Sequence, residues 1–196
     1  MKDEMKQLTM VTHRCNSIAK LRDESTYRFA EVDVHQCADG TIVCRHSHKY
    51  NGKNVKDIPY EIGMGPTLDS MVRAANVLGK ALFVEIKDVH SSKPDSYEQK
   101  VLDIVAKADW PVVILSFSAR VLTTIHMLDR TVPLVINSKD GTFSLSNGCI
   151  EKMCKGVCIR QADLASTNVH EFPIYLYETT GPIPEGTLSG IAGIIK

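Results

Sequence analysis

The chain has 196 residues, of which 43% are apolar and 23% charged, and its formal net charge is zero. This length allows one domain over residues 1–196 with a full core, and the lack of dense Lys/Arg blocks argues against nucleic acid as a partner. No apolar run could span a membrane, and Met1–Gln7 lacks a signal peptide's apolar region, so we expect a cytoplasmic protein without a membrane span.

The six cysteines do not form the pattern of a disulfide framework. Cys37, Cys44 and Cys158 lie in or beside predicted strands rather than in the loops of a small secreted domain. Cys154 and Cys158 are four residues apart, without a further Cys or His at zinc-ligand spacing. We therefore expect reduced, buried thiols.

Short β-rich runs alternate with amphipathic segments along the chain, which indicates βα units and a parallel sheet. Apolar residues at helical spacing predict helices over 67–78, 96–108 and 118–128. Eight strands are the number that closes a barrel, so the predicted fold is α/β, a compact TIM-type (β/α)8 barrel with reduced outer helices. The predicted strands are residues 8–12, 29–35, 82–87, 112–116, 132–136, 156–160, 173–177 and 191–195.

Two features lie between the second and third predicted barrel strands. Asp39-Gly40 stands between two apolar runs and predicts a hairpin turn, which folds the segment that carries His46 back beside strand two. Residues 48–66 form the longest stretch without clear periodicity. This stretch is either a loop over the mouth of a site or a solvated connector.

Polar residues interrupt the apolar strands at a few related positions. Glu31 and Asp33 are two apart in one strand, and Glu85 and Lys87 are two apart in the next, so each pair shares a face. Burying paired carboxylates is costly unless a cation or hydrogen-bond donors compensate. The alternative is structural: the acids could face solvent, and Glu85 and Lys87 could be a simple ion pair.

Three further polar residues belong with these acids and Lys87: His13 and Arg14 follow strand one, and His46 lies just before residues 48–66. Together they supply the groups that cleavage of a phosphodiester requires. Glu31, Asp33 and Glu85 offer oxygen ligands, which favour one divalent cation, Mg²⁺ or Ca²⁺. Arg14 and Lys87 can hold the charge of a phosphoryl group. His13 and His46 titrate near neutral pH and suit proton transfer. A small-molecule phosphodiester is the predicted substrate.

The motifs resemble those of the glycerophosphodiester phosphodiesterases, a TIM-barrel family, over nearly the whole chain. Glu31-Val32-Asp33-Val34, Asp39-Gly40 and His46 are similar in type and spacing to the family's run from metal ligands to second histidine. His13-Arg14 is similar to its opening His-Arg-Gly, and Val84-Glu85-Ile86-Lys87 to its Ile-Glu-Ile-Lys. Further similar motifs are Pro66-Thr67-Leu68, Leu115-Ser116-Phe117 and Gly193-Ile194-Ile195.

The resemblance implies a role for each of these residues. His13 and His46 would be the acid/base pair, Arg14 and Lys87 would bind phosphate, and the three acids would hold the cation. We assign His13 as base and His46 as acid, although the reverse assignment fits the sequence equally well. The implied reaction releases an alcohol and glycerol 3-phosphate, and a hydroxyl of the substrate's own glycerol can be the first nucleophile.

The chain also departs from the family pattern. Cys15 stands where the family has Gly, and Ser47 follows His46 where an Asp is usual. Glu31 comes so soon after strand one that we expect the first outer helix to be lost. A barrel without this cover would expose apolar surface on strands one, two and eight, from which we predict a homo-oligomer.

Two other functions remain open at this point. A sphingomyelinase D-like phospholipase shares the barrel and a pair of histidines, and a non-catalytic barrel could retain the same residues. We expect His35 to point away from Asp33 and to be structural.

Overall fold

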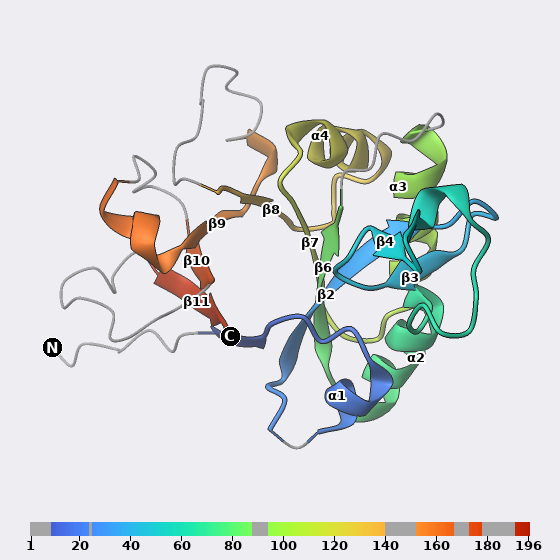
Figure 1. Cartoon of the computed structure of the whole chain (residues 1–196). Coiled ribbons are helices and arrows are strands. Elements are labelled where there is room, and N and C mark those ends of the chain that lie inside the picture. Colours follow the sequence, from blue (N-terminus) through green and yellow to red (C-terminus); the bar gives the residue numbers. More distant parts are fainter. Residues whose placement is uncertain (1–8, 24, 88–93, 140–151, 167–172, 178–190) are drawn as a thin grey trace, which may run out of the picture.

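The described part of the chain forms a closed barrel of eight parallel strands (Figure 1). The computed structural model describes residues 9–23, 25–87, 94–139, 152–166, 173–177 and 191–196. Around the ring the strands are β1 Thr9–Thr12, β2 Phe29–Gln36, β6 Ala81–Ile86, β7 Val112–Ser116, β8 Leu134–Asn137, β9 Gly156–Arg160, β10 Ile174–Tyr177 and β11 Ile191–Ile195. Each predicted strand overlaps one of these, so the predicted TIM-type barrel is confirmed.

Alternation along the strands divides the apolar residues between two cores. One core fills the barrel and takes inward-facing side chains such as Val11, Phe83 and Leu115. Gly193 also faces this interior, where an added Cβ would lie 2.6 Å from the Thr9 carbonyl oxygen and 2.9 Å from the Tyr175 ring. The second and larger core lies between the outer faces of the strands and the helices.

Four α-helices gather on the side of the barrel formed by β2, β6 and β7 (Figure 1). They are α1 Ile18–Arg22, α2 Leu68–Leu78, α3 Pro94–Val105 and α4 Ala119–Leu128. α2 begins after Thr67, whose hydroxyl accepts a hydrogen bond from the Ser70 amide, and ends at Gly79 in the left-handed conformation. The three predicted helices are therefore confirmed, with shifted ends. No helix of the described residues is both long and apolar enough to cross a membrane.

The predicted hairpin after β2 is present. β3 Ile42–Cys44 pairs antiparallel with the end of β2, and Gly40 takes a positive φ of 85° in the turn. The side chain of Asp39 accepts a hydrogen bond from the Thr41 amide at 3.0 Å. Beyond β3 the chain forms a second small hairpin, β4 Lys49–Tyr50 with β5 Lys53–Asn54, and the 3-10 turn η1 Val55–Asp57. A further 3-10 turn, η2, covers Gln161–Ser166.

Two expectations about the outer layer need correction. The first outer helix is reduced rather than lost, because α1 keeps five residues and buries Leu21 against the core. The outer faces of β2 and β11 are not exposed either. Val32 and Val34 of β2 are fully buried, and Ile191 and Ile194 of β11 are almost completely buried. The exposed apolar flank from which we predicted an oligomer is therefore absent from these two strands.

Helix α2 provides a direct test of the outer core. Val72 is 1% exposed and packs between helix and barrel, whereas Val77 on the same helix is 87% exposed. We expect Val72→Ala to lower the free energy of unfolding by about 1.5–3 kcal/mol, because two buried methyl groups are removed. The matched change Val77→Ala should alter it by less than about 0.5 kcal/mol. Equal effects in urea unfolding would contradict this packing.

Candidate active site

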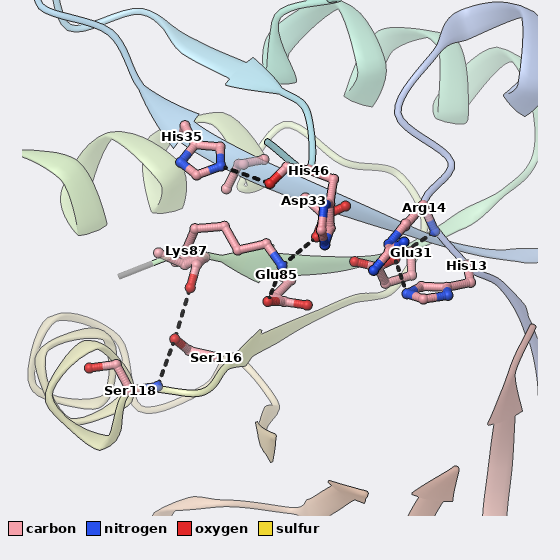
Figure 2. A network of polar contacts seen from close by, with 12 residues as sticks. His13, Arg14, Glu31, Asp33, His35, His46, Glu85, Lys87, Ser116 and Ser118 are labelled. Atoms are coloured by element: carbon pink, nitrogen blue, oxygen red, sulfur yellow. Dashed lines mark hydrogen bonds and ion pairs between the residues drawn. The ribbon is translucent and has the colours of Figure 1, made fainter. Parts of the chain in front are cut away.

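Three carboxylates meet at the carboxyl ends of two adjacent strands. Glu31 and Asp33 lie on β2, Glu85 lies on β6, and one ligand oxygen from each falls within 4.8 Å of the others. The parallel register pairs Asp33 with Glu85 directly across the ladder, which places the two side chains beside each other (Figure 2). All three residues are buried. The predicted convergence of these acids is therefore present in the structure.

Lys87 lies between two of the three acids (Figure 2). Its Nζ is 2.7 Å from Asp33 Oδ1 and 2.5 Å from Glu85 Oε1. Burial lowers the pKa of Lys87, but the facing carboxylates of Glu85 and Asp33 raise it more, so the net shift is upward. Lys87 is therefore a charged ammonium. Three ionised carboxylates against this one ammonium leave two negative charges.

The backbone after β1 supports the carboxylates of β2. Arg14 has a positive φ of 50°, and its amide donates a hydrogen bond of 2.7 Å to Glu31 Oε2. Asn16 contacts Asp33 twice: its Nδ2 donates to Asp33 Oδ2 at 2.7 Å, and its Oδ1 accepts from the Asp33 amide at 2.9 Å. The loop from residue 14 to residue 16 thus fixes the direction of both acids.

Protonation separates the three acids. Burial raises the pKa of Glu31 well above its usual range, and the carboxylates of Asp33 and Glu85 raise it further. Burial also raises the pKa of Glu85, although Lys87 opposes the shift. For Asp33, burial is outweighed by Lys87 and by the hydrogen bond from Asn16, so its pKa is lowered. Without a cation, Glu31 is the acid that takes up a proton most readily.

The two predicted catalytic histidines lie at different sides of this cluster. His13 follows β1, and its Nε2 is 3.9 Å from Glu31 Oε2. His46 follows β3 and lies on the side of Asp33 (Figure 2). Burial and the charge of Arg14 lower the pKa of His13 to about 4, and burial also lowers the pKa of His46. His13 is therefore neutral at pH 7 and can accept a proton, whereas the Asp33 carboxylate opposes the shift at His46.

A cavity of about 970 Å³ opens over the cluster at the carboxyl ends of the strands. Its walls include six of the seven predicted site residues. The seventh, Asp33, does not line the cavity but contacts Lys87, which does. The six are His13, Arg14, Glu31, His46, Glu85 and Lys87. His48, Asn54 and Lys56 also line it, so part of the stretch 48–66 covers the mouth of the site. This position favours the loop over the mouth of the site rather than the solvated connector.

The orientation expected for His35, away from Asp33, is also wrong. Residues two apart on a strand share a face, so His35 points to the same side as Asp33 and lines the cavity. Its Nε2 lies 3.4 Å from the carbonyl oxygen of His46, and its Nδ1 has no hydrogen-bond partner among the described residues. Burial lowers the pKa of His35 to about 4. His35 is therefore a neutral contact beneath His46.

The residues that depart from the family pattern lie around the site rather than in it. Cys15 is fully buried behind the Arg14 turn, and its amide donates to the Glu31 carbonyl at 2.6 Å. Ser47 bonds locally to Lys49 through its hydroxyl. The described cysteines are free thiols, as predicted, and Cys149 lies outside the described residues. Neither substitution disturbs the carboxylate cluster.

The donor set fits a hard divalent cation. Three carboxylates offer oxygen ligands, and Glu31 Oε1 is buried with no hydrogen-bond partner among the described residues. An orphaned buried carboxylate oxygen is costly, and a cation is the kind of partner that removes this cost. One divalent ion would also balance the two negative charges that Lys87 leaves. Glu31, Asp33 and Glu85 are the residues that would hold it.

Comparison with solved structures identifies the same fold in known enzymes. A glycerophosphodiester phosphodiesterase from Parabacteroides distasonis is 18% identical, has a TM-score of 0.80, and covers 97% of this chain and 92% of its own. An Oleispira antarctica phosphodiesterase, solved with its product sn-glycerol-3-phosphate, is 15% identical with a TM-score of 0.78, covering 95% and 92%. The Agrobacterium tumefaciens glycerophosphodiester phosphodiesterase is 15% identical, with a TM-score of 0.69 and coverage of 96% and 95%.

This chain has the fold of the glycerophosphodiester phosphodiesterases. No family model matches the sequence, and no curated protein matches it either. The similarity is therefore carried by the three-dimensional structure, and it confirms at the level of fold the resemblance first read from a few short motifs.

Asn16 is the supporting residue that sequence reasoning missed. It lies three residues after His13, in a loop without periodicity, and no pattern in the sequence marks it. The available signal was weak: an amide residue three positions after the candidate catalytic His13, which follows a strand.

The raised pKa of Glu31 predicts how the cation-free protein responds to pH. Between the unfolded pKa and the raised folded pKa, the unfolded chain binds fewer protons, so stability falls as pH rises. Glu31→Gln cannot ionise and escapes this loss. With chelator present, we expect the variant to gain free energy of unfolding over wild type as pH rises from about 4.5 to 8.

The control for this prediction is Glu61→Gln, which changes an exposed carboxylate in the same way. It should follow wild type across the whole range. Urea unfolding at several pH values measures both variants. A Glu31→Gln variant that is less stable than wild type at pH 8 would show that Glu31 is stabilised as a carboxylate without a cation.

Proposed function

We propose that this chain is a metal-dependent phosphodiesterase that hydrolyses glycerophosphodiesters to an alcohol and glycerol 3-phosphate. The observation that carries the proposal is the buried convergence of Glu31, Asp33 and Glu85 with a charged Lys87, inside a cavity that both His13 and His46 line. Proteins with the same fold include an enzyme solved with sn-glycerol-3-phosphate, and this supports the proposed substrate class.

The residues of the chain divide the chemical work between charge and proton transfer. Arg14 and Lys87 border the cavity and stabilise the negative charge of the phosphoryl oxygens. A divalent cation held by the three acids would add positive charge at those oxygens and so help stabilise the transition state. Fixed cations act strongly here because the cluster is buried.

Proton transfer falls to the two histidines. His13 is neutral and therefore can take a proton from the attacking group, either water or a hydroxyl of the substrate's own glycerol. Attack by the glycerol hydroxyl expels the alcohol and gives a cyclic phosphate, which water then opens to glycerol 3-phosphate. In the same assignment His46, on the other side of the cluster, acts as the acid in its protonated form, which the Asp33 carboxylate favours, and gives that proton to the departing alkoxide. An acid and a base on different sides of one phosphorus match a displacement in which the entering and leaving oxygens are opposed. The reverse assignment uses the same two residues.

The charged cavity favours this proposal over a lipid-cleaving enzyme. Its lining includes Arg14, Lys56, Lys87, Lys139 and Arg160, beside the acidic cluster. A phospholipase of the sphingomyelinase D type needs an apolar platform for lipid chains, whereas this lining suits a small anionic substrate.

The cation requirement gives the first test of activity. With Mg²⁺ or Ca²⁺, wild type should hydrolyse bis(p-nitrophenyl) phosphate and glycerophosphodiesters, and excess EDTA should abolish turnover. Glu85→Gln removes one charged ligand and should lower both the activity and the apparent affinity for the cation, measured by metal titration. Activity that is indifferent to chelator would refute the metal-dependent mechanism.

The histidines give the second test. His13→Ala and His46→Ala should each lower kcat by about 10²- to 10⁴-fold, because each removes one general acid or base. His126, on α4 and outside the cavity lining, is the matched control, and His126→Ala should retain wild-type activity. Near-normal kcat in both site variants, with folding checked by circular dichroism, would sink the assignment of these two residues.

A further inference from the structure

The proposed reaction uses only one side of the cavity. The acids, the histidines and Lys87 come from β1, β2, β6 and the segment after β3. The other side is formed by the carboxyl ends of β7 to β10, and it contains Phe117, Asn137, Lys139, Arg160 and Tyr177. A phosphodiester that places its phosphorus near Lys87 extends one of its two substituents toward this side.

Asn137 is the feature of this side that points to a ligand. Val135, two residues earlier on β8, belongs to the core inside the barrel, so Asn137 faces the interior as well and lines the cavity. Its side chain is only 7% exposed, and its Oδ1 has no hydrogen-bond partner among the described residues. A buried amide oxygen without a donor is costly, which indicates that the donor comes from a bound molecule.

The surroundings of Asn137 restrict what that donor can be. The rings of Phe117 and Tyr177 pack edge to face with centroids 6.4 Å apart, and the Tyr177 hydroxyl is tied to the Ser138 carbonyl at 3.1 Å. These rings offer an apolar wall to a carbon skeleton. Lys139 lies over Phe117, with Nζ 5.7 Å from the ring centroid.

Charge then separates the two kinds of donor that a substrate can carry. An ammonium group beside Asn137 would be repelled by Lys139, for which no carboxylate partner is found among the described residues. Arg160 lines the same side, where its guanidinium is paired with Asp163 at 2.6 Å. A neutral hydroxyl carries no such penalty. The site therefore suits an uncharged hydroxylated substituent rather than an amino alcohol.

We propose that Asn137 is a specificity-determining residue that accepts a hydrogen bond from a hydroxyl of a polyol substituent of the substrate. This proposal rests on the proposed phosphodiesterase function and names its substrate class: phosphodiesters with an uncharged polyol on the β7–β10 side. The bond is made in the bound substrate through Asn137 Oδ1, and it involves no covalent step. Diesters without a hydroxyl leave this oxygen unsatisfied and lose the interaction.

The experiment compares two diesters that differ in hydroxyl groups. Glycerophosphoglycerol carries polyols on both sides, whereas bis(p-nitrophenyl) phosphate carries no hydroxyl. Asn137→Leu should lower kcat/KM for the first by about 5- to 150-fold, the loss expected for one buried hydrogen bond. For bis(p-nitrophenyl) phosphate it should change kcat/KM by less than about twofold. Asn137→Asp keeps acceptor oxygens, so the ratio of the two kcat/KM values should stay near that of wild type.

A thermal unfolding measurement separates specificity from a structural role. Leu replaces an unsatisfied polar group with an apolar one of similar size, so Asn137→Leu should unfold at the same temperature as wild type or higher. A structural Asn would instead give a lower Tm. An equal loss of kcat/KM for both substrates, or an unchanged ratio in Asn137→Leu, would overturn the proposal.

Binding tests the same inference without turnover. By calorimetry, wild type should bind sn-glycerol 3-phosphate more tightly than inorganic phosphate, and Asn137→Leu should lose that preference. If neither diester is cleaved, the proposed phosphodiesterase function fails, and the binding ratio still decides the role of Asn137. If the diesters are cleaved but the binding preference is the same in both proteins, the role of Asn137 is wrong while the phosphodiesterase function stands.

Discussion

The constraint on which this site depends is the mutual repulsion of three buried carboxylates. Glu31, Asp33 and Glu85 meet within 4.8 Å, and the ammonium of Lys87 contacts Asp33 and Glu85 and offsets one of their negative charges. Such a cluster can be kept only by a fold whose own stability exceeds its cost. Here that fold is a closed parallel barrel with one core inside it and a second core beneath α2, α3 and α4. The rigidity of β2 and β6 holds the acids together when repulsion would separate them.

The same constraint explains the local structure after β1. A loop that turns through a left-handed residue presents the Arg14 amide to Glu31, and Asn16 then bonds Asp33 through both its backbone and its carboxylate. These donors stabilise negative charge without adding a mobile cation. They also keep each carboxylate in one direction, which leaves Glu31 Oε1 without a hydrogen-bond partner in the part of the chain that the structure describes. Carboxylates held in fixed directions in this way could bind a cation with little rearrangement of the site.

The strands could be predicted because eight short β-rich runs, most of them separated by amphipathic segments, are strong local signals. Glu31, Asp33 and Glu85 then followed from their positions within two of these strands. What local patterns could not predict was contact between distant loops. Asn16 and Asn137 lie in the site because of how loop and barrel close in space, and no motif marks either residue. The error at His35 had another origin: the period-two rule was misapplied, since residue 35 shares its face with residue 33. The first outer helix was predicted from the sequence to be lost, but a short helix, α1, remains there and buries Leu21.

A parallel barrel brings the carboxyl ends of all its strands to one rim, and this geometry allows chemistry and recognition to occupy different strands. In this chain the charged groups that we propose act on phosphate come from the ends of β1, β2 and β6, while Phe117, Asn137 and Tyr177 come from the segments at the ends of β7, β8 and β10. Among the described residues, no hydrogen bond or ion pair joins Asn137 to the carboxylates. A change at β7 to β10 can therefore alter which substituent fits without raising the cost of the buried acids. The costly cluster of buried charges is confined to the strands that the helices cover, so the residues of the opposite wall can differ in the substituent that we propose they recognise without changing that cluster.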